Sequence, residues 1–152
     1  MTVIIGPLHD LAAMRRLGVA CGLEDEGRDD EGIVAAWGAY DGDELVGSIA
    51  LERFAGMHTA NWLAVRDDYR RRGIAAELYA ALEREALARG IGRLSVTARA
   101  PAFWVAQGFE PLPPGPESDA LLGGCLDCDQ YGRDCAPEAL SKQLQKPGPG
   151  GR

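Results

Sequence analysis

Apolar residues in the first half of the chain change between a helical spacing and runs that are typical of strands. A short strand is expected at Val3–Ile5, and from Leu8 to Val19 the apolar residues recur near helical spacing, which predicts a helix. Ile33–Tyr40 and Glu44–Arg53 are apolar and rich in strand-forming residues around an Asp-Gly-Asp turn, and Thr59–Val65 follows a second glycine turn. The pattern therefore predicts a strand, a helix and an antiparallel meander of three strands.

The second half of the chain has the pattern of alternating helices and strands. A helix is predicted after Gly73, because Ile74, Leu78, Leu82 and Ala86 form one apolar stripe. Closely spaced prolines between positions 111 and 116 predict an extended loop. The other expected elements are a strand at Arg93–Ala98, a short helix at Pro101–Gln107, a strand entry at Gly108–Leu112, a final strand at Glu138–Leu144 and a disordered tail at 146–152.

Length and composition narrow the class of protein. The chain has 152 residues, of which 46% are hydrophobic and 26% are charged, and this predicts one globular domain over residues 1–145. No apolar run approaches the roughly 20 residues that span a bilayer. The start of the chain also lacks the basic leader and cleavage site of a signal peptide. We therefore expect a cytoplasmic protein without a membrane partner.

Charge is distributed unevenly along the chain. The net charge of -7 argues against a nucleic-acid partner, because affinity for phosphate backbones depends on Lys and Arg. Residues 66–99 nevertheless hold eight of the sixteen basic residues against five acidic ones. A basic island in an acidic chain favours a small anion bound at one place, and a solvated helix face is the alternative.

A strand, a basic turn and a helix follow one another between residues 63 and 75. Leu63-Ala64-Val65 ends the strand, Arg70-Arg71-Arg72 supplies positive charge, and Gly73 stands where the helix begins. Such a junction leaves unpaired backbone N–H groups at the start of the helix, where the helix dipole also favours an anion. Gly73 allows a close approach or a positive φ, and Ala75 keeps the next position nearly as bare. The segment predicts a pyrophosphate-binding turn.

These residues resemble the GNAT acetyltransferase family. Its acyl-CoA motif has Arg or Gln, two residues, Gly, one residue and then Gly or Ala, and Arg70, Gly73 and Ala75 fill these positions. A second stretch, Ala102–Phe109, resembles the family's helix with adjacent aromatic residues that leads into Gly-Phe. The two motifs stand in the family's order, and the resemblance covers residues 3–144.

The resemblance implies an α/β (α+β) fold and a binding mode for acetyl-CoA. The fold has a mixed, mostly antiparallel sheet of roughly six to seven strands with about four helices, and it splays between the fourth and fifth strands. Leu63 and Val65 would pair with the pantetheine in the manner of a strand. The backbone amides that would hold the pyrophosphate belong to Arg71, Arg72, Gly73 and Ala75.

The resemblance further implies a direct attack of an amine on the acetyl carbonyl. That reaction needs a base for the amine and an acid for the leaving thiolate. Glu52, at the end of the third strand, and His58, with an unperturbed pKa near neutrality, are the candidate bases. Trp104 occupies the position where many relatives have the Tyr that protonates the thiolate, and an indole N–H is far too weak an acid.

A cysteine cluster near the end of the chain suggests separate chemistry. Cys125, Cys128 and Cys135 have a spacing that, in a reducing compartment, indicates metal or redox chemistry more often than a structural disulfide. Zinc requires four ligands in a structural site, and the fourth would come from Cys21, His58, a nearby Asp or a second chain. A redox-active or disulfide pair of Cys125 and Cys128, and unliganded thiols, stay open beside zinc.

Together these features predict an acetyl-CoA-dependent N-acetyltransferase that acts on a small primary amine. The acidic stretch Glu24–Glu31, a loop or short helix, lies where the family places substrate-recognition loops and would favour a cationic amine. Cys135–Leu144 loosely resembles the last strand of a GNAT subgroup associated with arsenic resistance or amino-acid acetylation. The alternative is a GNAT-fold sensor module that binds acyl-CoA or a metal without efficient turnover. A homodimer also stays open.

Overall fold

The computed structural model describes residues 2–23, 30–126 and 137–144. The tail expected at 146–152 and most of the acidic stretch at 24–31 lie outside these residues. The elements in chain order are β1 (Val3–Pro7), α1 (Leu11–Ala20), η1 (Asp30–Gly32), β2 (Ile33–Asp41), β3 (Glu44–Phe54), β4 (Met57–Val65), η2 (Asp67–Tyr69), α2 (Ile74–Ala88), β5 (Arg93–Ala98), α3 (Pro101–Ala106), β6 (Glu110–Pro111), α4 (Pro116–Leu126) and β7 (Glu138–Gln143).

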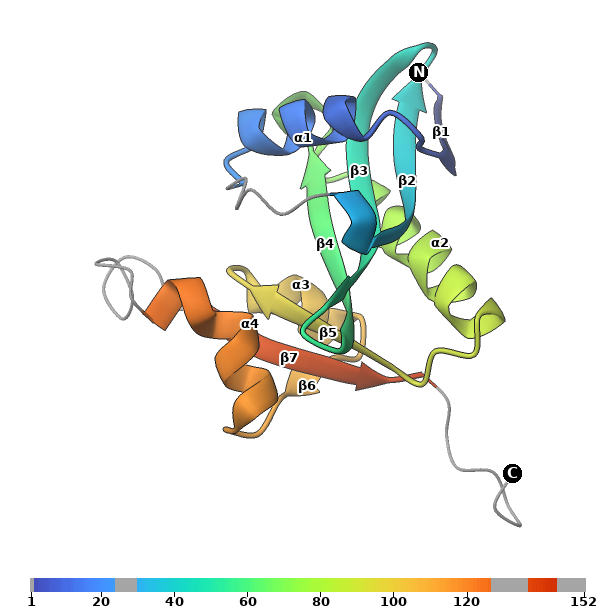
Figure 1. Cartoon of the computed structure of the whole chain (residues 1–152). Coiled ribbons are helices and arrows are strands. Elements are labelled where there is room, and N and C mark those ends of the chain that lie inside the picture. The colour runs from blue at the N-terminus through green and yellow to red at the C-terminus, as the bar shows by residue number, and fades with distance from the viewer. Residues whose placement is uncertain (1, 24–29, 127–136, 145–152) are drawn as a thin grey trace.

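The described strands form one seven-stranded sheet in the order β1-β2-β3-β4-β5-β7-β6 (Figure 1). Neighbouring strands are antiparallel, except that β4 and β5 run parallel. The predicted meander is confirmed as β2, β3 and β4. Its two hairpin turns contain Gly42 and Gly56, with φ of 62° and 77°, a region that glycine enters without steric cost. The mixed sheet and its four helices confirm the expected fold class.

Helices cover both faces of this sheet. Ala50 of β3 belongs to the same buried cluster as Met14 of α1, whereas its neighbours Ile49 and Leu51 cluster with Leu78 of α2. Successive strand residues point to opposite faces, so α1 and α2 lie on opposite sides of the sheet. Met14, Ile49, Leu51 and Leu78 are fully buried, and each such side chain stabilises the fold by roughly 1.5–3 kcal/mol.

Helix α1 begins at Leu11 and not at Leu8 as its apolar spacing predicts. The Leu8 N–H donates to the Ala36 carbonyl at 3.0 Å, so the chain is still extended at this point. Leu8 enters the core from that extended segment. The Asp10 side chain then accepts from the Ala13 N–H at 3.0 Å and caps the helix.

The extended loop predicted over the prolines is wrong at its end, because Pro116 begins α4. Proline is favoured at the first helical position, where its missing N–H would be unpaired in any residue. The Asp119 N–H closes the first turn on the Gly115 carbonyl at 2.9 Å. On β5, the Thr97 hydroxyl donates to the Leu121 carbonyl of α4 at 2.8 Å, which ties the helix to the sheet. None of the described helices has the length and apolarity that a bilayer crossing requires.

Candidate active site

Strands β4 and β5 touch at a single position and then part. Thr59 is paired with Ser95, and the described strands have no other β4–β5 pair, whereas β5 pairs with β7 at six positions. Leu63 and Val65 lie on the part of β4 beyond this contact, and on their other side Val65 still pairs with Gly47 of β3. The splay expected between the fourth and fifth strands is therefore present (Figure 1).

Glu52 lies in line with the point at which the strands part. It pairs with Thr59, which pairs in turn with Ser95, so the three residues form a row across β3, β4 and β5. The Glu52 side chain is 2% exposed, and its Oε1 accepts from Nδ2 of Asn61 at 2.9 Å. A buried carboxylate is costly unless it is hydrogen-bonded, so Asn61 stabilises its position.

Strand β4 carries a β-bulge beside this carboxylate. Ser48 pairs with Ala64 while Ala50 pairs with Asn61, so Trp62 and Leu63 together oppose one residue of β3. Trp62 has a φ of 56°, a strained value for a residue other than glycine. Side chains hold this conformation, because the Trp62 N–H donates to Asn61 Oδ1 at 2.8 Å and the Ser48 hydroxyl donates to the Trp62 carbonyl at 2.7 Å.

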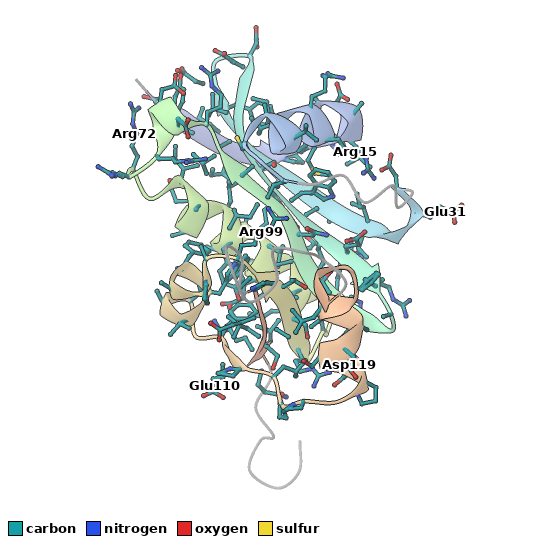
Figure 2. The ribbon with its side chains drawn as sticks, turned by 90° about the vertical axis from the view of Figure 1, so that its left-hand side faces the viewer. Arg15, Glu31, Arg72, Arg99, Glu110 and Asp119 are labelled. Atoms are coloured by element: carbon teal, nitrogen blue, oxygen red, sulfur yellow. The ribbon has the colours of Figure 1, made fainter. Side chains whose placement is uncertain are left out.

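The Trp62 ring is fixed under helix α1. It is 6% exposed, and a Cβ placed on Gly18 would lie 2.5 Å from Cε3 of the ring. The Arg15 guanidinium covers the ring at 5.2 Å from its centroid, and its Nε donates to Asp30 at 3.1 Å. Figure 2 shows Arg15 beside α1. Helix α1 therefore supports the bulge from the face opposite to α2.

The predicted pyrophosphate turn has two residues in the left-handed region. Arg71 has a φ of 64° and Gly73 a φ of 77°, and α2 begins directly after Gly73. A Cβ on Gly73 would meet no atom within 4 Å, so glycine is required here by its backbone conformation and the space beside it is open. No side chain caps α2 at Gly73, so the first N–H groups of the helix are candidate donors to an anion.

The three arginines of this turn have different surroundings. Arg70 Nε donates to the Val65 carbonyl at 3.0 Å, which ties the turn to the end of β4. Arg72 Nη2 donates to the Asp68 carbonyl at 3.0 Å. The guanidinium of Arg72 also lies 5.1 Å from the Tyr69 ring centroid, and Figure 2 shows Arg72 at the outer edge of the molecule. Within the described residues, the exposed Arg71 side chain makes no hydrogen bond or ion pair.

His58 does not meet Glu52. It pairs with Arg53, one position from the pair formed by Glu52 and Thr59, so its side chain points to the opposite face of the sheet. His58 is half-buried and lines a pocket with Arg53 and Arg89. Burial, followed by the charges of Arg53 and Arg89, lowers the pKa of His58 below its usual value.

Trp104 is part of an aromatic cluster in the core. Its ring lies edge-on to Tyr79 at 5.8 Å and to Phe109 at 5.2 Å. Tyr79 donates to Glu83 Oε1 at 2.8 Å, and Lys142 Nζ contacts the same oxygen at 2.5 Å. Burial, with a smaller effect of the bond to Glu83, raises the pKa of Tyr79, so this phenol keeps its proton.

The cysteine prediction falls largely outside the described part of the chain. Cys128 and Cys135 lie outside it, and Cys125 is placed only as a residue of α4. Over residues 2–23, 30–126 and 137–144, no three His, Cys, Asp or Glu side chains come together as a metal site. The described residues therefore lend the zinc hypothesis no support.

Two residues of the site, Asn61 and Ser48, are not among the sequence candidates. Both act through side-chain contacts that depend on the register of β3 with β4. Asn61 could have been found from the sequence. It stands two residues after Thr59 on the same strand, so in a regular antiparallel pairing of β3 with β4 its side chain lies on the same face as Glu52. The bulge at Trp62 shifts the register of β4 after Asn61, and the apolar pattern of the sequence does not predict this bulge.

Comparison with known proteins identifies a family and a fold. Residues 10–109, more than half of the chain, match the model of the acetyltransferase (GNAT) family. No curated protein sequence matches the chain.

Solved structures with the same fold include three bacterial proteins. The ribosomal-protein-S18-alanine N-acetyltransferase of Escherichia coli is 17% identical, with 97% of each chain covered and a TM-score of 0.69. Rv2747 of Mycobacterium tuberculosis, in complex with CoA and NLQ, is 16% identical, with 93% of this chain and 99% of that chain covered and a TM-score of 0.69.

The third is N-acetylglutamate synthase of Neisseria gonorrhoeae, complexed with coenzyme A and N-acetyl-glutamate. It is 21% identical, with a TM-score of 0.68. The match covers 96% of this chain but only 36% of that longer protein. At these identities the three likenesses concern the fold, whereas the family match concerns the sequence itself. The chain belongs to the GNAT family of acetyltransferases.

Proposed function

We propose that this protein transfers the acetyl group of acetyl-CoA directly to a small primary amine. The observation that carries the proposal is the row of Glu52, Thr59 and Ser95, which aligns a buried carboxylate with the point where β4 and β5 part. A thioester lying between the parted strands would have this carboxylate near its acyl group. The CoA complexes among structures of the same fold support the choice of acyl donor.

Acetyl-CoA would be held at the turn before α2 and along β4. The open space at Gly73 and the uncapped N–H groups after it fit a pyrophosphate, and Arg71 would add a charge that other side chains do not neutralise. Arg70 and Arg72 would act mainly by stabilising the turn. Leu63 and Val65, where β4 has lost its β5 partner, would pair with the pantetheine amides.

Glu52 would act as the base. An ammonium group must lose its proton before its nitrogen can attack, and the Glu52 carboxylate would accept this proton directly or through one water. The neutral amine would then attack the carbonyl carbon, and the C–S bond would break as the amide forms. Asn61 would be a positioning residue, because its amide holds the carboxylate at 2.9 Å.

The CoA sulfur would leave as a thiolate without a dedicated acid. A thiol with a pKa near that of free cysteine, about 8.5, is a good leaving group at neutral pH. Trp104 has no acidic proton to offer, and Tyr79 has a raised pKa in the core. His58 remains a second candidate base, disfavoured by its position on the opposite face from Glu52.

The test is thiol release from acetyl-CoA with a panel of small primary amines, and with N-terminally free peptides as a separate arm. The proposal predicts amine-dependent release of thiol and an N-acetylated small molecule by mass spectrometry. Turnover of the peptides alone would contradict the substrate class. Tight acetyl-CoA binding without a product from any acceptor would favour the sensor-module alternative, for which the missing Tyr at Trp104 is the specific observation.

A further inference from the structure

A pocket of about 560 Å³ lies at the end of the sheet away from the pyrophosphate turn. Its walls come from the β3–β4 hairpin, from the connection between α2 and β5, and from the first residues of β5. In Figure 1 the hairpin lies at the lower ends of β3 and β4 and the connection follows the lower end of α2, whereas α2 begins higher in the view. The pocket is therefore separate from the turn proposed for the pyrophosphate, and its lining reaches Ser95, the residue of β5 where β4 and β5 part.

The charged lining of the pocket is entirely basic. Arg53 comes from β3, Arg89 from the end of α2 and Arg93 from β5, and the lining includes no Asp or Glu. Arg89 contacts Glu85 at 2.6 Å and Arg93 contacts Glu117, so each of these two has a carboxylate outside the lining. The exposed Arg53 side chain makes no hydrogen bond or ion pair within the described residues.

This concentration of positive charge is unusual in a chain of net charge -7. The carboxyl end of α2 contributes roughly half a negative charge at the same place. The carboxylates of Glu85 and Glu117 balance two of the three guanidinium groups, and Arg53, unpaired among the described residues, outweighs the helix end. Each offers a planar fork of donors that matches carboxylate and phosphate oxygens. Arg53 has no anionic partner in the described part of the chain, and ion pairs as exposed as those of Arg89 and Arg93 contribute only about 0–1 kcal/mol, so both side chains can contact an anion in the pocket instead. Three such groups around one pocket favour a ligand with more than one acidic group.

His58 lines the same pocket as these arginines. Its pKa is lowered first by burial and then by Arg53 and Arg89, with Arg93 lining the pocket from β5. A neutral imidazole offers one donor and one acceptor to a ligand. Val34, Met57 and Ile91 add apolar walls, and the volume lies within the range of roughly 300–1,000 Å³ typical of small-molecule sites. The lining therefore suits a ligand with a carbon skeleton.

We propose that this pocket binds a small organic polyanion, with two or more carboxylate or phosphate groups contacting Arg53, Arg89 and Arg93. The site does not depend on the proposed acetyl transfer, and its ligand is distinct from the CoA held at the turn before α2.

The experiment is isothermal titration calorimetry of the full chain with citrate and, separately, with pyrophosphate, at one fixed low ionic strength. An Arg71→Glu background weakens the turn before α2 as a competing anion site. Arg53→Glu removes the pocket arginine that has no partner. Arg84→Glu is the matched control. Arg84 is exposed on α2 and does not line the pocket, and its substitution changes the net charge by the same amount as Arg53→Glu. Near-ultraviolet circular dichroism confirms that each variant is folded.

The proposal predicts that at least one probe binds the Arg71→Glu protein. Adding Arg53→Glu should weaken this binding at least about tenfold, and adding Arg84→Glu should not. Binding of citrate alone would support a carboxylate ligand, and binding of pyrophosphate alone a phosphate ligand. Two outcomes overturn the proposal: no binding of either probe once Arg71 is replaced, and equal weakening by the Arg53 and Arg84 substitutions. A perturbed His58 imidazole signal in NMR spectra, on addition of the bound probe, is the second readout.

Discussion

Asn61 donates its side-chain N–H to Glu52 at 2.9 Å and accepts the Trp62 N–H at 2.8 Å, so one amide joins the buried carboxylate to the bulge of β4. A carboxamide is suited to this position because it carries a donor and an acceptor on one planar group. Its orientation is fixed by both partners. The position of the Glu52 carboxylate and the strained backbone of Trp62 are therefore coupled.

Replacing Asn61 with Ala should lower the free energy of unfolding and the rate of acetyl transfer together. Glu52 and the Trp62 N–H each lose a partner, which costs about 1–3 kcal/mol for a buried polar group. Urea unfolding measures the free energy of unfolding. The rate of acetyl transfer is measured as kcat, which we expect to fall about tenfold. An unchanged kcat in a folded Asn61→Ala protein would show that the amide does not position the carboxylate.

Gly73→Ala should weaken acetyl-CoA binding. Alanine at a φ of 77° is strained by roughly 1 kcal/mol, and the turn would relax away from its anion-binding shape. We expect the Kd for CoA to rise about tenfold, which corresponds to about 1.4 kcal/mol. Gly42→Ala is the control, because Gly42 also has a positive φ, of 62°, but lies in the β2–β3 hairpin. Equal effects of the two substitutions on the Kd would argue against the turn as the CoA site.

Gly18→Ala should destabilise the protein even though it replaces a helical glycine. Alanine normally stabilises a helix by about 1 kcal/mol relative to glycine. Here the new Cβ would lie 2.5 Å from the Trp62 ring, and overpacking of this kind costs about 1–3 kcal/mol. Urea unfolding should therefore show a net loss, and Gly6→Ala, where a Cβ meets nothing within 4 Å, is the comparison. A more stable Gly18→Ala protein would mean that Trp62 moves without cost.

The pKa of His58 should lie below 6.5 and should rise when Arg53 is replaced by Ala. Because the folded pKa is below the unfolded one, the unfolded state binds the proton more readily. This group therefore lowers stability as the pH falls below the unfolded pKa, and stability recovers as the pH rises above it. NMR titration checks the pKa, and His58→Gln should flatten the loss of stability between about pH 7 and pH 5. A measured pKa above 6.5 would show that burial and the neighbouring arginines do not lower the pKa of His58.

Much of the fold could be predicted from the sequence because its determinants are local. The alternating runs around Gly42 and Gly56 specify hairpins, and the apolar stripe after Gly73 specifies α2. The proline pattern does not predict the start of α4, because proline ends some helices and begins others, and only the following residues distinguish the two cases. The apolar spacing predicts too early a start for α1, because Leu8 is apolar for a tertiary reason: it enters the core from the extended segment before the helix.

The residues of the candidate site likewise fall into those that the sequence alone predicts and those that depend on contacts between strands. The turn at Arg70–Ala75 is a contiguous motif, so the sequence alone predicts it, and the sequence also predicts Glu52 as a strand-end carboxylate near the parted strands. The partners of Glu52 and Trp62 come from other strands, so they depend on a register that the bulge alters. His58 was a candidate for its pKa alone, and strand alternation places it on the face away from Glu52.

Glu52→Gln separates the role of Glu52 as the base for acetyl transfer from its other contributions, because glutamine keeps the size of the side chain and removes its basicity. The measurement is kcat for the best amine of the panel, with the Kd for CoA determined on the same preparation. If Glu52 is the base, kcat falls about 10²–10⁴-fold while the Kd for CoA is unchanged. A Glu52→Gln protein that binds CoA normally and transfers acetyl groups within about threefold of the parent rate would contradict this role.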